Sequence, residues 1–222
     1  MARPQLRSEP NLRELLGGRS GAIDATLPVA AFVVGLSVGQ AGAWVSPVAW
    51  GCGAAVVATV ALGAVRIARG GRPRAVVFGL LGVAVAAVVA LVTGRAVDFF
   101  LVRIVSNAVS ATAWAVSIVV RWPLLGMVVG ALLGQRTRWH RDRDLVRGYQ
   151  RASWVWVGQY AVRLAVFLPL YFADAALALG IAQTALTWPL VAVCVAMSWP
   201  LVRGALPAGH PGIRRPVRPP QQ

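Results

Sequence analysis

Two arginines, Arg121 and Arg163, lie inside long apolar stretches of the sequence, where a charged side chain is difficult to accommodate. Arginine stays protonated at physiological pH, so it cannot avoid the cost of burial by losing its proton. At the centre of a membrane-spanning helix that cost is about 2.5–3.5 kcal/mol on insertion scales. An arginine kept at such a cost usually faces a partner, a cavity or an anion.

The polar residues around these arginines recur at helical spacing, so they share helix faces. The first face consists of Arg103, Asn107, Ser110, Trp114, Ser117 and Arg121. The second consists of Trp156, Tyr160, Arg163, Phe167 and Asp174, and a milder third consists of Thr184, Thr187, Val191, Cys194 and Ser198. Because polar faces of membrane helices turn toward the bundle interior, we predict a ligand-binding set of Arg121, Arg163, Arg103, Asn107 and Tyr160.

Three interpretations of the two deep arginines remain open at this stage. In the first, each binds backbone carbonyls that Pro123 and Pro169 free from helical hydrogen bonds, or extends along its own stem toward water. In the second, a bent helix brings Asp98 or Asp174 down to pair with the arginines. In the third, the arginines hold an anion, either a solute or a lipid phosphate.

Residue patterns for catalysis or metal binding do not appear in the sequence. There is no Ser-His-Asp set, no HExxH motif and no pair of carboxylates within an apolar stretch. His140 and His210 have no second ligand at metal spacing, and Cys52 and Cys194 are typical of small buried hydrophobic residues. We therefore expect a protein that is not an enzyme and that has no metal or other cofactor.

The composition is that of a membrane protein. Of the 222 residues, 58% are hydrophobic and 13% are charged, whereas soluble domains carry about 25% charged residues. The net charge of +15 is compatible with nucleic-acid binding, but the arginines gather at the ends of apolar stretches, as the positive-inside rule predicts. The expected partner is the lipid bilayer and not a nucleic acid.

Six apolar stretches are long enough to cross a bilayer: 26–45, 47–67, 75–94, 99–134, 154–172 and 176–202. The basic residues in the segments between them alternate between many and few, provided that 99–134 crosses only once. We therefore predict an all-α, polytopic membrane helix bundle with six transmembrane helices and both termini in the cytoplasm. This topology places Arg121 near mid-depth in a helix that spans from about residue 112. The preceding part, residues 99–111, protrudes, lies at the outer interface or re-enters.

The predicted domain organisation has three parts. Residues 1–24 form a cytoplasmic segment with a short interfacial helix, residues 25–203 form the six-helix transmembrane domain, and residues 204–222 form a disordered, basic, proline-rich tail. Five residues are assigned structural roles. Asp24 is an N-cap, Asp98 is a carboxylate near the outer surface, and Pro123 bends a helix. Gly126 and Gly130 are positions of close packing. The glycines favour packing within the chain over dimerisation, although an oligomer stays open.

A set of short motifs resembles one family of membrane proteins. The motifs are Leu16-Gly-Gly-Arg19, Gly21, Asp24, Leu27-Pro28, Gly94-Arg-Ala, Asp98-Phe-Phe100, Asn107, Arg121-Trp-Pro-Leu124, Gly126, Arg163 and Pro169-Leu-Tyr171. Over about residues 13–203 the chain resembles the actinobacterial proteins grouped as domain of unknown function 3159. It is more distantly similar to the bacterial intracellular septation protein A family. The resemblance implies a location in the cytoplasmic membrane of an actinobacterium, and it implies no activity.

These observations favour a multi-pass protein of the cytoplasmic membrane without catalysis. We expect it to bind or transport a small anionic solute or a lipid headgroup at Arg121 and Arg163. The alternative is a structural or regulatory protein of the cell envelope, as the septation-like architecture suggests.

Overall fold

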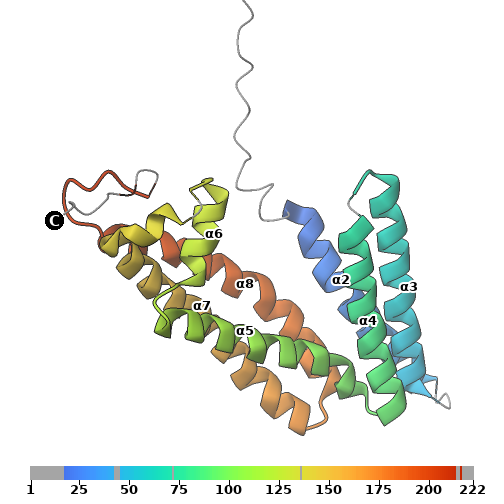
Figure 1. Cartoon of the computed structure of the whole chain (residues 1–222). Helices are drawn as coiled ribbons and strands as arrows, with labels where there is room; N and C mark the ends of the chain where they lie inside the picture. Colours follow the sequence, from blue (N-terminus) through green and yellow to red (C-terminus); the bar gives the residue numbers. More distant parts are fainter. Residues whose placement is uncertain (1–17, 43–45, 72, 136, 214–215, 217–222) are drawn as a thin grey trace, which may run out of the picture. The chain divides into compact units, whose positions relative to one another are not determined.

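The computed structural model describes residues 18–42, 46–71, 73–135, 137–213 and 216, and these residues form helices and connecting turns with no strand among them (Figure 1). The all-α prediction is thereby confirmed for the described residues. The chain divides into two compact units, Met1–Phe99 and Phe100–Gln222. The predicted domain boundaries stay a prediction. Each unit is described below by itself.

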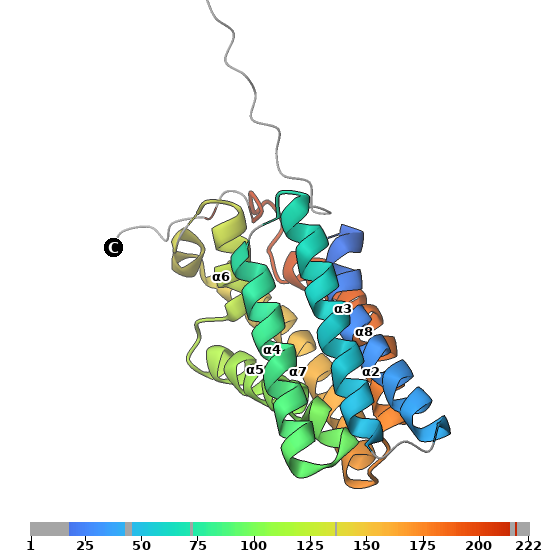
Figure 2. The ribbon, with the colours of Figure 1, turned by 90° about the vertical axis from the view of Figure 1, so that its right-hand side faces the viewer.

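The first unit contains three long helices, α2 (Gly18–Ala41), α3 (Pro47–Ala68) and α4 (Pro73–Thr93). Helix α3 contacts both α2 and α4, and the three helices run alongside one another (Figure 2). Glycine permits the close approach of α2 to α3, because a Cβ atom at Gly35 would lie 2.7 Å from the carbonyl oxygen of Trp50. Phe32, which is fully buried, stacks on Phe99 with ring centroids 4.0 Å apart.

The second unit is built around α7 (Arg143–Phe172), which contacts α5 (Leu101–Val119), α6 (Leu124–Leu132) and α8 (Ala176–Gly204). The described residues also include two short 3-10 helices. The first, η1 (Ala96–Phe100), leads into α5, and the second, η2 (Arg138–Arg141), lies between α6 and α7. The core at the α6 end consists of Leu125, Trp139, Leu145, Tyr149, Ala152 and Val202.

Within the described residues, five helical segments are long and apolar enough to cross a membrane: Pro47–Ala68, Pro73–Thr93, Ala96–Val119, Arg143–Phe172 and Ala176–Gly204. A shorter apolar stretch, Thr26–Ala41, belongs to α2. These lengths and compositions support a protein that spans a membrane. Six crossings and cytoplasmic termini remain predictions.

The prediction that one helix spans from about residue 112 to residue 134 is wrong. Helix α5 ends at Val119, and α6 begins only at Leu124. Arg121 lies in the turn between them with a φ of 58°, in the left-handed region, and its side chain is exposed. Helix α6 has 9 residues and is about 14 Å long, so it is too short to cross a bilayer on its own.

Hydrogen bonds explain why the helix stops before Arg121. The N–H of Trp122 donates to the carbonyl of Ser117 (2.9 Å), and the N–H of Arg121 donates to the carbonyl of Ile118 (3.0 Å). This pair of bonds is the Schellman motif, in which a left-handed residue closes a helix. Pro123 follows as the buried N-cap of α6 and has no N–H with which to continue the helix.

One other structural prediction changes near the start of the chain. Asp24 lies inside α2, which begins at Gly18, so Asp24 is not an N-cap. The predicted interfacial helix at 11–17 lies outside the described residues. In the described part of the tail, His210 Nε2 lies 2.9 Å from Asp142 Oδ2, and Gln135 Nε2 donates to the carbonyl of Ile213 (2.8 Å). The predicted disorder of the tail stays a prediction.

Gly126 and Gly130 of α6 are buried, as expected for close packing. Contrary to the prediction, however, Gly126 does not pack against the backbone of another helix. A Cβ atom at Gly126 would lie 2.6 Å from Cζ3 of Trp139, so the indole of η2 fills the space above this glycine. Gly130 accepts a hydrogen bond at its carbonyl from the N–H of Gln135 (2.8 Å), which closes α6.

Candidate functional site

The polar faces predicted on three helices meet in the interior of the second unit. Helices α5 and α7 are antiparallel, because Trp114 stacks on Trp156 at 5.1 Å while Gln150 Nε2 donates to the carbonyl of Ile118, further along α5 (3.2 Å). Continuing this register brings Asn107 to the level of Arg163. The same Trp156 also reaches α8, because its indole N–H donates to Ser198 Oγ (3.1 Å).

Arg163 lies at the centre of this interior and is only 4% exposed. Its Nη2 atom donates to the backbone carbonyl of Thr187 on α8 (2.9 Å), and its guanidinium carbon lies 5.7 Å from the centroid of the Tyr160 ring. The Nε atom is buried and has no hydrogen-bond partner in the described part of the chain. One donor of the guanidinium is therefore left without an acceptor.

Arg103 on α5 brings a second positive charge to the same place. It lies close enough to Arg163 for the two charges to repel one another, and it also interacts with Tyr160. Neither arginine has an acidic partner among the described residues: the ion pairs there join Arg95 to Asp98, Arg147 to Asp144 and His210 to Asp142. Two guanidinium groups within electrostatic range of one another, with no acidic partner among the described residues, make this interior positive.

Several buried amide groups around the arginines are also without hydrogen-bond partners in the described residues. Asn107 is 3% exposed and its Nδ2 atom has no acceptor. Gln159 on α7 and Gln183 on α8 are 4% and 8% exposed, and the Oε1 atom of each has no donor. Buried polar groups are nearly always satisfied in folded proteins, so this concentration of unsatisfied groups makes the interior the candidate functional site.

Four of the five predicted ligand-binding residues lie in this interior, which we call the arginine cluster: Arg103, Asn107, Tyr160 and Arg163. The fifth, Arg121, does not join them. Its carbonyl oxygen lies 3.3 Å from Nε2 of His140, at the turn between α5 and α6, and its side chain is exposed. The break in the helix at Val119 removes Arg121 from the polar face that the helical period predicted.

The structure distinguishes between the interpretations that the sequence left open for Arg163. A backbone carbonyl does accept a hydrogen bond from this arginine, but it is that of Thr187 in the neighbouring helix and not one freed by Pro169. Asp98 pairs with Arg95 (3.9 Å) and Asp174 closes α7 with a φ of 55°. A single carbonyl satisfies one donor of Arg163 and neutralises none of its charge.

Two glutamines of this interior, Gln159 and Gln183, are absent from the predicted ligand-binding set. Gln183 precedes Thr187 by one helical turn, and the Thr187 hydroxyl donates to its carbonyl (2.6 Å). Gln159 directly precedes Tyr160. The signal was available in the sequence: a glutamine inside an apolar stretch carries a polar group that must find a partner.

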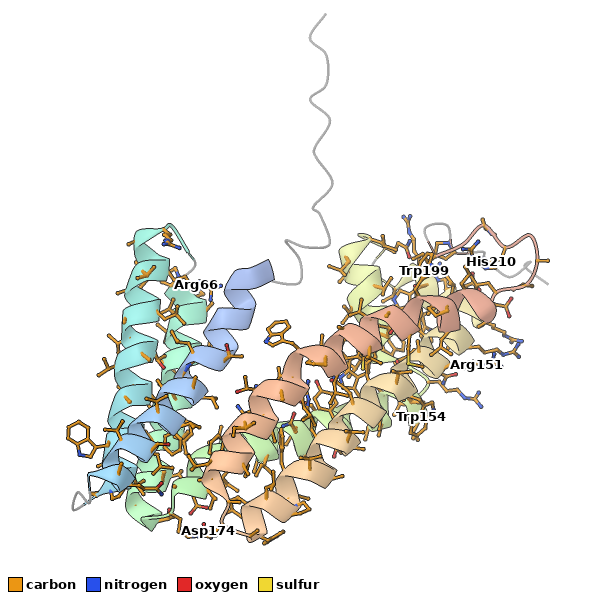
Figure 3. All side chains as sticks on the ribbon, turned by 180° about the vertical axis from the view of Figure 1, so that it is seen from behind. Arg66, Arg151, Trp154, Asp174, Trp199 and His210 are labelled. Atoms are coloured by element: carbon orange, nitrogen blue, oxygen red, sulfur yellow. The ribbon has the colours of Figure 1, made fainter. Side chains whose placement is uncertain are left out.

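Charged and aromatic residues mark the two ends of α7 and α8, and the arginine cluster lies between these ends (Figure 3). Asp174 marks one end, whereas Arg151 and His210 lie toward the other, with Trp154 and Trp199 nearby. Trp154 and Trp199 are 55% and 57% exposed, as expected of tryptophans at a membrane–water interface. Arg163 lies between the two ends of α7.

Residues 16–209 match the family described as Protein of unknown function (DUF3159). The chain belongs to this family. Among curated proteins and among solved structures, none matches the chain. DUF3159 membership confirms the family that the sequence motifs indicated, and it brings no activity with it, so a function must be argued from the geometry of the arginine cluster.

Proposed function

We propose that this DUF3159 protein is an integral protein of the cytoplasmic membrane that binds a small anion, either a solute or a lipid headgroup, at the arginine cluster. The observation that carries the proposal is the buried Arg163, whose Nε has no acceptor and whose charge has no acidic partner in the described residues, with the charge of Arg103 nearby. A ligand with several acceptor oxygens would satisfy the unpartnered Nε of Arg163 and the unpartnered amide of Asn107 together.

Electrostatics favours an anion over a neutral ligand at this place. Two positive charges held near one another in a medium of low dielectric constant repel one another more strongly than in water. An unpaired buried charge is destabilising, and removal of one partner from a buried pair typically costs about 3–5 kcal/mol. A bound anion supplies the missing partner for both guanidinium groups, so binding energy is concentrated at this cluster.

The membrane topology that goes with this proposal has six crossings, with α2 as the first and α5 with α6 as the fourth. The basic residues of the loops then lie on the cytoplasmic side together with both termini. The site needs no catalytic group, and we propose a binding or transport role in place of catalysis. The sequence resemblance supports an actinobacterial membrane as the location.

A second candidate is a structural or regulatory role in the cell envelope, in line with the distant resemblance to septation protein A. One observation favours it: the bond from Arg163 to the Thr187 carbonyl joins α7 to α8, as does the bond from Trp156 to Ser198. In this case Arg163 holds the helix pair together and binds nothing further. The two candidates differ in what loss of the arginine would do.

Equilibrium binding of inorganic phosphate and sulfate to the purified protein tests the proposal. We expect Arg163→Gln and Arg103→Gln each to weaken anion binding by about tenfold or more, because one charge-assisted hydrogen bond is worth about 1.5–3 kcal/mol. The matched control is Arg147→Gln on the same helix, whose side chain is 70% exposed and pairs with Asp144. This control should bind like the wild type.

Two outcomes would contradict the anion site. If wild type and both cluster variants bind phosphate and sulfate equally, the anion is held elsewhere. If Arg163→Gln unfolds, while the folded Arg103→Gln binds like the wild type, Arg163 has the structural role of the second candidate. Uptake of the same anions into liposomes then separates binding from transport.

A further inference from the structure

A second place in the same unit has the chemistry of a lipid site, and it lies apart from the arginine cluster. Helix α6, the following turn and η2 enclose a groove of about 390 Å³. Its walls are Trp122, Met127, Ala131, Gly134, Thr137 and Trp139. Five of these six residues have no charged or hydroxyl group, so the groove suits a hydrocarbon chain.

One wall of the groove is a fixed group of aromatic rings. Trp122 stacks on His140 with ring centroids 4.0 Å apart and meets Trp139 edge to face at 6.2 Å. Trp139 in turn packs edge to face on Tyr149 of α7 at 5.6 Å and is 1% exposed. Its indole N–H has no acceptor in the described part of the chain. The wall is thus preorganised and has a spare donor.

The outer face of α6 also requires hydrocarbon around it. Met127, Val128 and Leu132 are 38%, 49% and 50% exposed. Trp122, at the start of α6, is 38% exposed, and tryptophan is enriched where a membrane meets water. A short apolar helix of this kind, with a tryptophan at one end, fits the boundary between acyl chains and headgroups.

Arginines flank the groove in the chain on both sides. Arg121 directly precedes Trp122, and Arg138 lies between Thr137 and Trp139, with both arginines exposed. The nearby carboxylates are already engaged: Asp142 accepts bonds from the N–H groups of Asp144 and Leu145 and pairs with His210, and Asp144 pairs with Arg147. The charge beside the groove is therefore positive and matches an anionic headgroup.

We propose that this groove binds one acyl chain of an anionic phospholipid, with the lipid phosphate held by Arg121 and Arg138. The apolar walls supply affinity for the chain, and the two arginines supply preference for a negative headgroup. The inference stands independently of the arginine cluster, because the two sites share no residue. The lipid site also gives a role to Arg121, which lies outside the arginine cluster.

Native mass spectrometry of the full-length protein, titrated with phosphatidylglycerol or with phosphatidylcholine, tests this site. We expect the wild type to retain one phosphatidylglycerol in preference to phosphatidylcholine. Ala131→Phe fills the groove and should lose this adduct, whereas Val128→Phe, on the same helix but outside the groove lining, should keep it. The double variant Arg121→Gln with Arg138→Gln should lose the preference for phosphatidylglycerol.

Two controls distinguish a bound lipid phosphate from free inorganic phosphate and from binding at other exposed arginines. Arg69→Gln with Arg74→Gln removes two exposed arginines from the first unit and should leave the adduct unchanged. Excess inorganic phosphate should not displace the lipid, since the acyl chain contributes to binding. Displacement by phosphate, equal retention of both lipids by the wild type, or an unchanged adduct in Ala131→Phe would each overturn the proposal.

Discussion

Arg121 occupies a position after α5 that helices usually give to glycine. Its φ of 58° and the two hydrogen bonds from Arg121 and Trp122 back to α5 define a Schellman motif. Residues other than glycine pay about 1–3 kcal/mol for a sparsely populated backbone conformation of this kind. The residue kept there despite this cost is a charged one, which is consistent with a role at the protein surface.

Glycine at this position gives the first prediction. We expect Arg121→Gly to stabilise the protein by about 1 kcal/mol, because glycine adopts a positive φ without a steric penalty. Thermal unfolding in detergent without added phospholipid measures the change. Gly134→Ala is the mirror control at the end of α6, where φ is 63°, and it should be destabilising. A loss of stability in Arg121→Gly would show instead that the arginine side chain makes a stabilising contact.

The residue scale also shows how far the sequence predicts the site. The polar faces of α5, α7 and α8 follow from helical spacing, which is a local property, and the structure confirms that Trp114, Trp156 and Ser198 face neighbouring helices. The position of Arg121 was mispredicted because an apolar stretch hides a break that contains no glycine. Pro123 was the sign of that break, since proline often follows a helix end.

Helix α6 is held in place by packing against η2, and it is too short to span a membrane. Gly126 faces the indole of Trp139, and Leu125 joins the buried cluster around Leu145 and Tyr149. Gly126 and Trp139 are 13 positions apart in the chain, and their spacing alone does not predict that they pack together. The sequence predicted that Gly126 and Gly130 are small for packing, and only the structure shows that a tryptophan is the partner of Gly126.

This contact gives the second prediction, at the scale of the element. Gly126→Ala should destabilise the protein by about 1–3 kcal/mol, because overpacking forces the rigid Trp139 ring to move. Gly79→Ala in α4 is the matched control, since nothing lies within 4 Å of its added Cβ atom. It should be neutral or stabilising by up to about 1 kcal/mol, as alanine is the better helix former. Equal effects of the two substitutions on thermal unfolding would refute the role given to Trp139.

At the scale of the whole molecule, the helices that the sequence predicted are largely those of the structure, because apolar length and composition are strong signals. Contacts between distant segments are a different matter. The tail was predicted to be disordered from its proline and arginine content, yet His210 meets Asp142, 68 positions away in the chain. Asp142 also caps α7, so this pairing depends on a folded helix end that composition does not reveal.

The six-crossing topology gives the third prediction. With a membrane-impermeant maleimide on intact cells, Ser46→Cys and Asp174→Cys should react, whereas Thr137→Cys and Ala208→Cys should react only after permeabilisation. The wild type is the control, because Cys52 and Cys194 are each 2% exposed and should stay unlabelled. Labelling of positions 46 and 137 from the same side would contradict six crossings.

Phosphate binding by Arg163→Met tests the central claim most directly. Methionine keeps an unbranched apolar stem while removing the buried charge, which has no acidic partner in the described residues, so we expect the fold to persist. The anion-binding account predicts that Arg163→Met folds and that its unfolding temperature equals or exceeds that of the wild type. It also predicts that this variant no longer binds phosphate at the wild-type affinity. Phosphate binding by a folded Arg163→Met at the wild-type affinity would contradict the account.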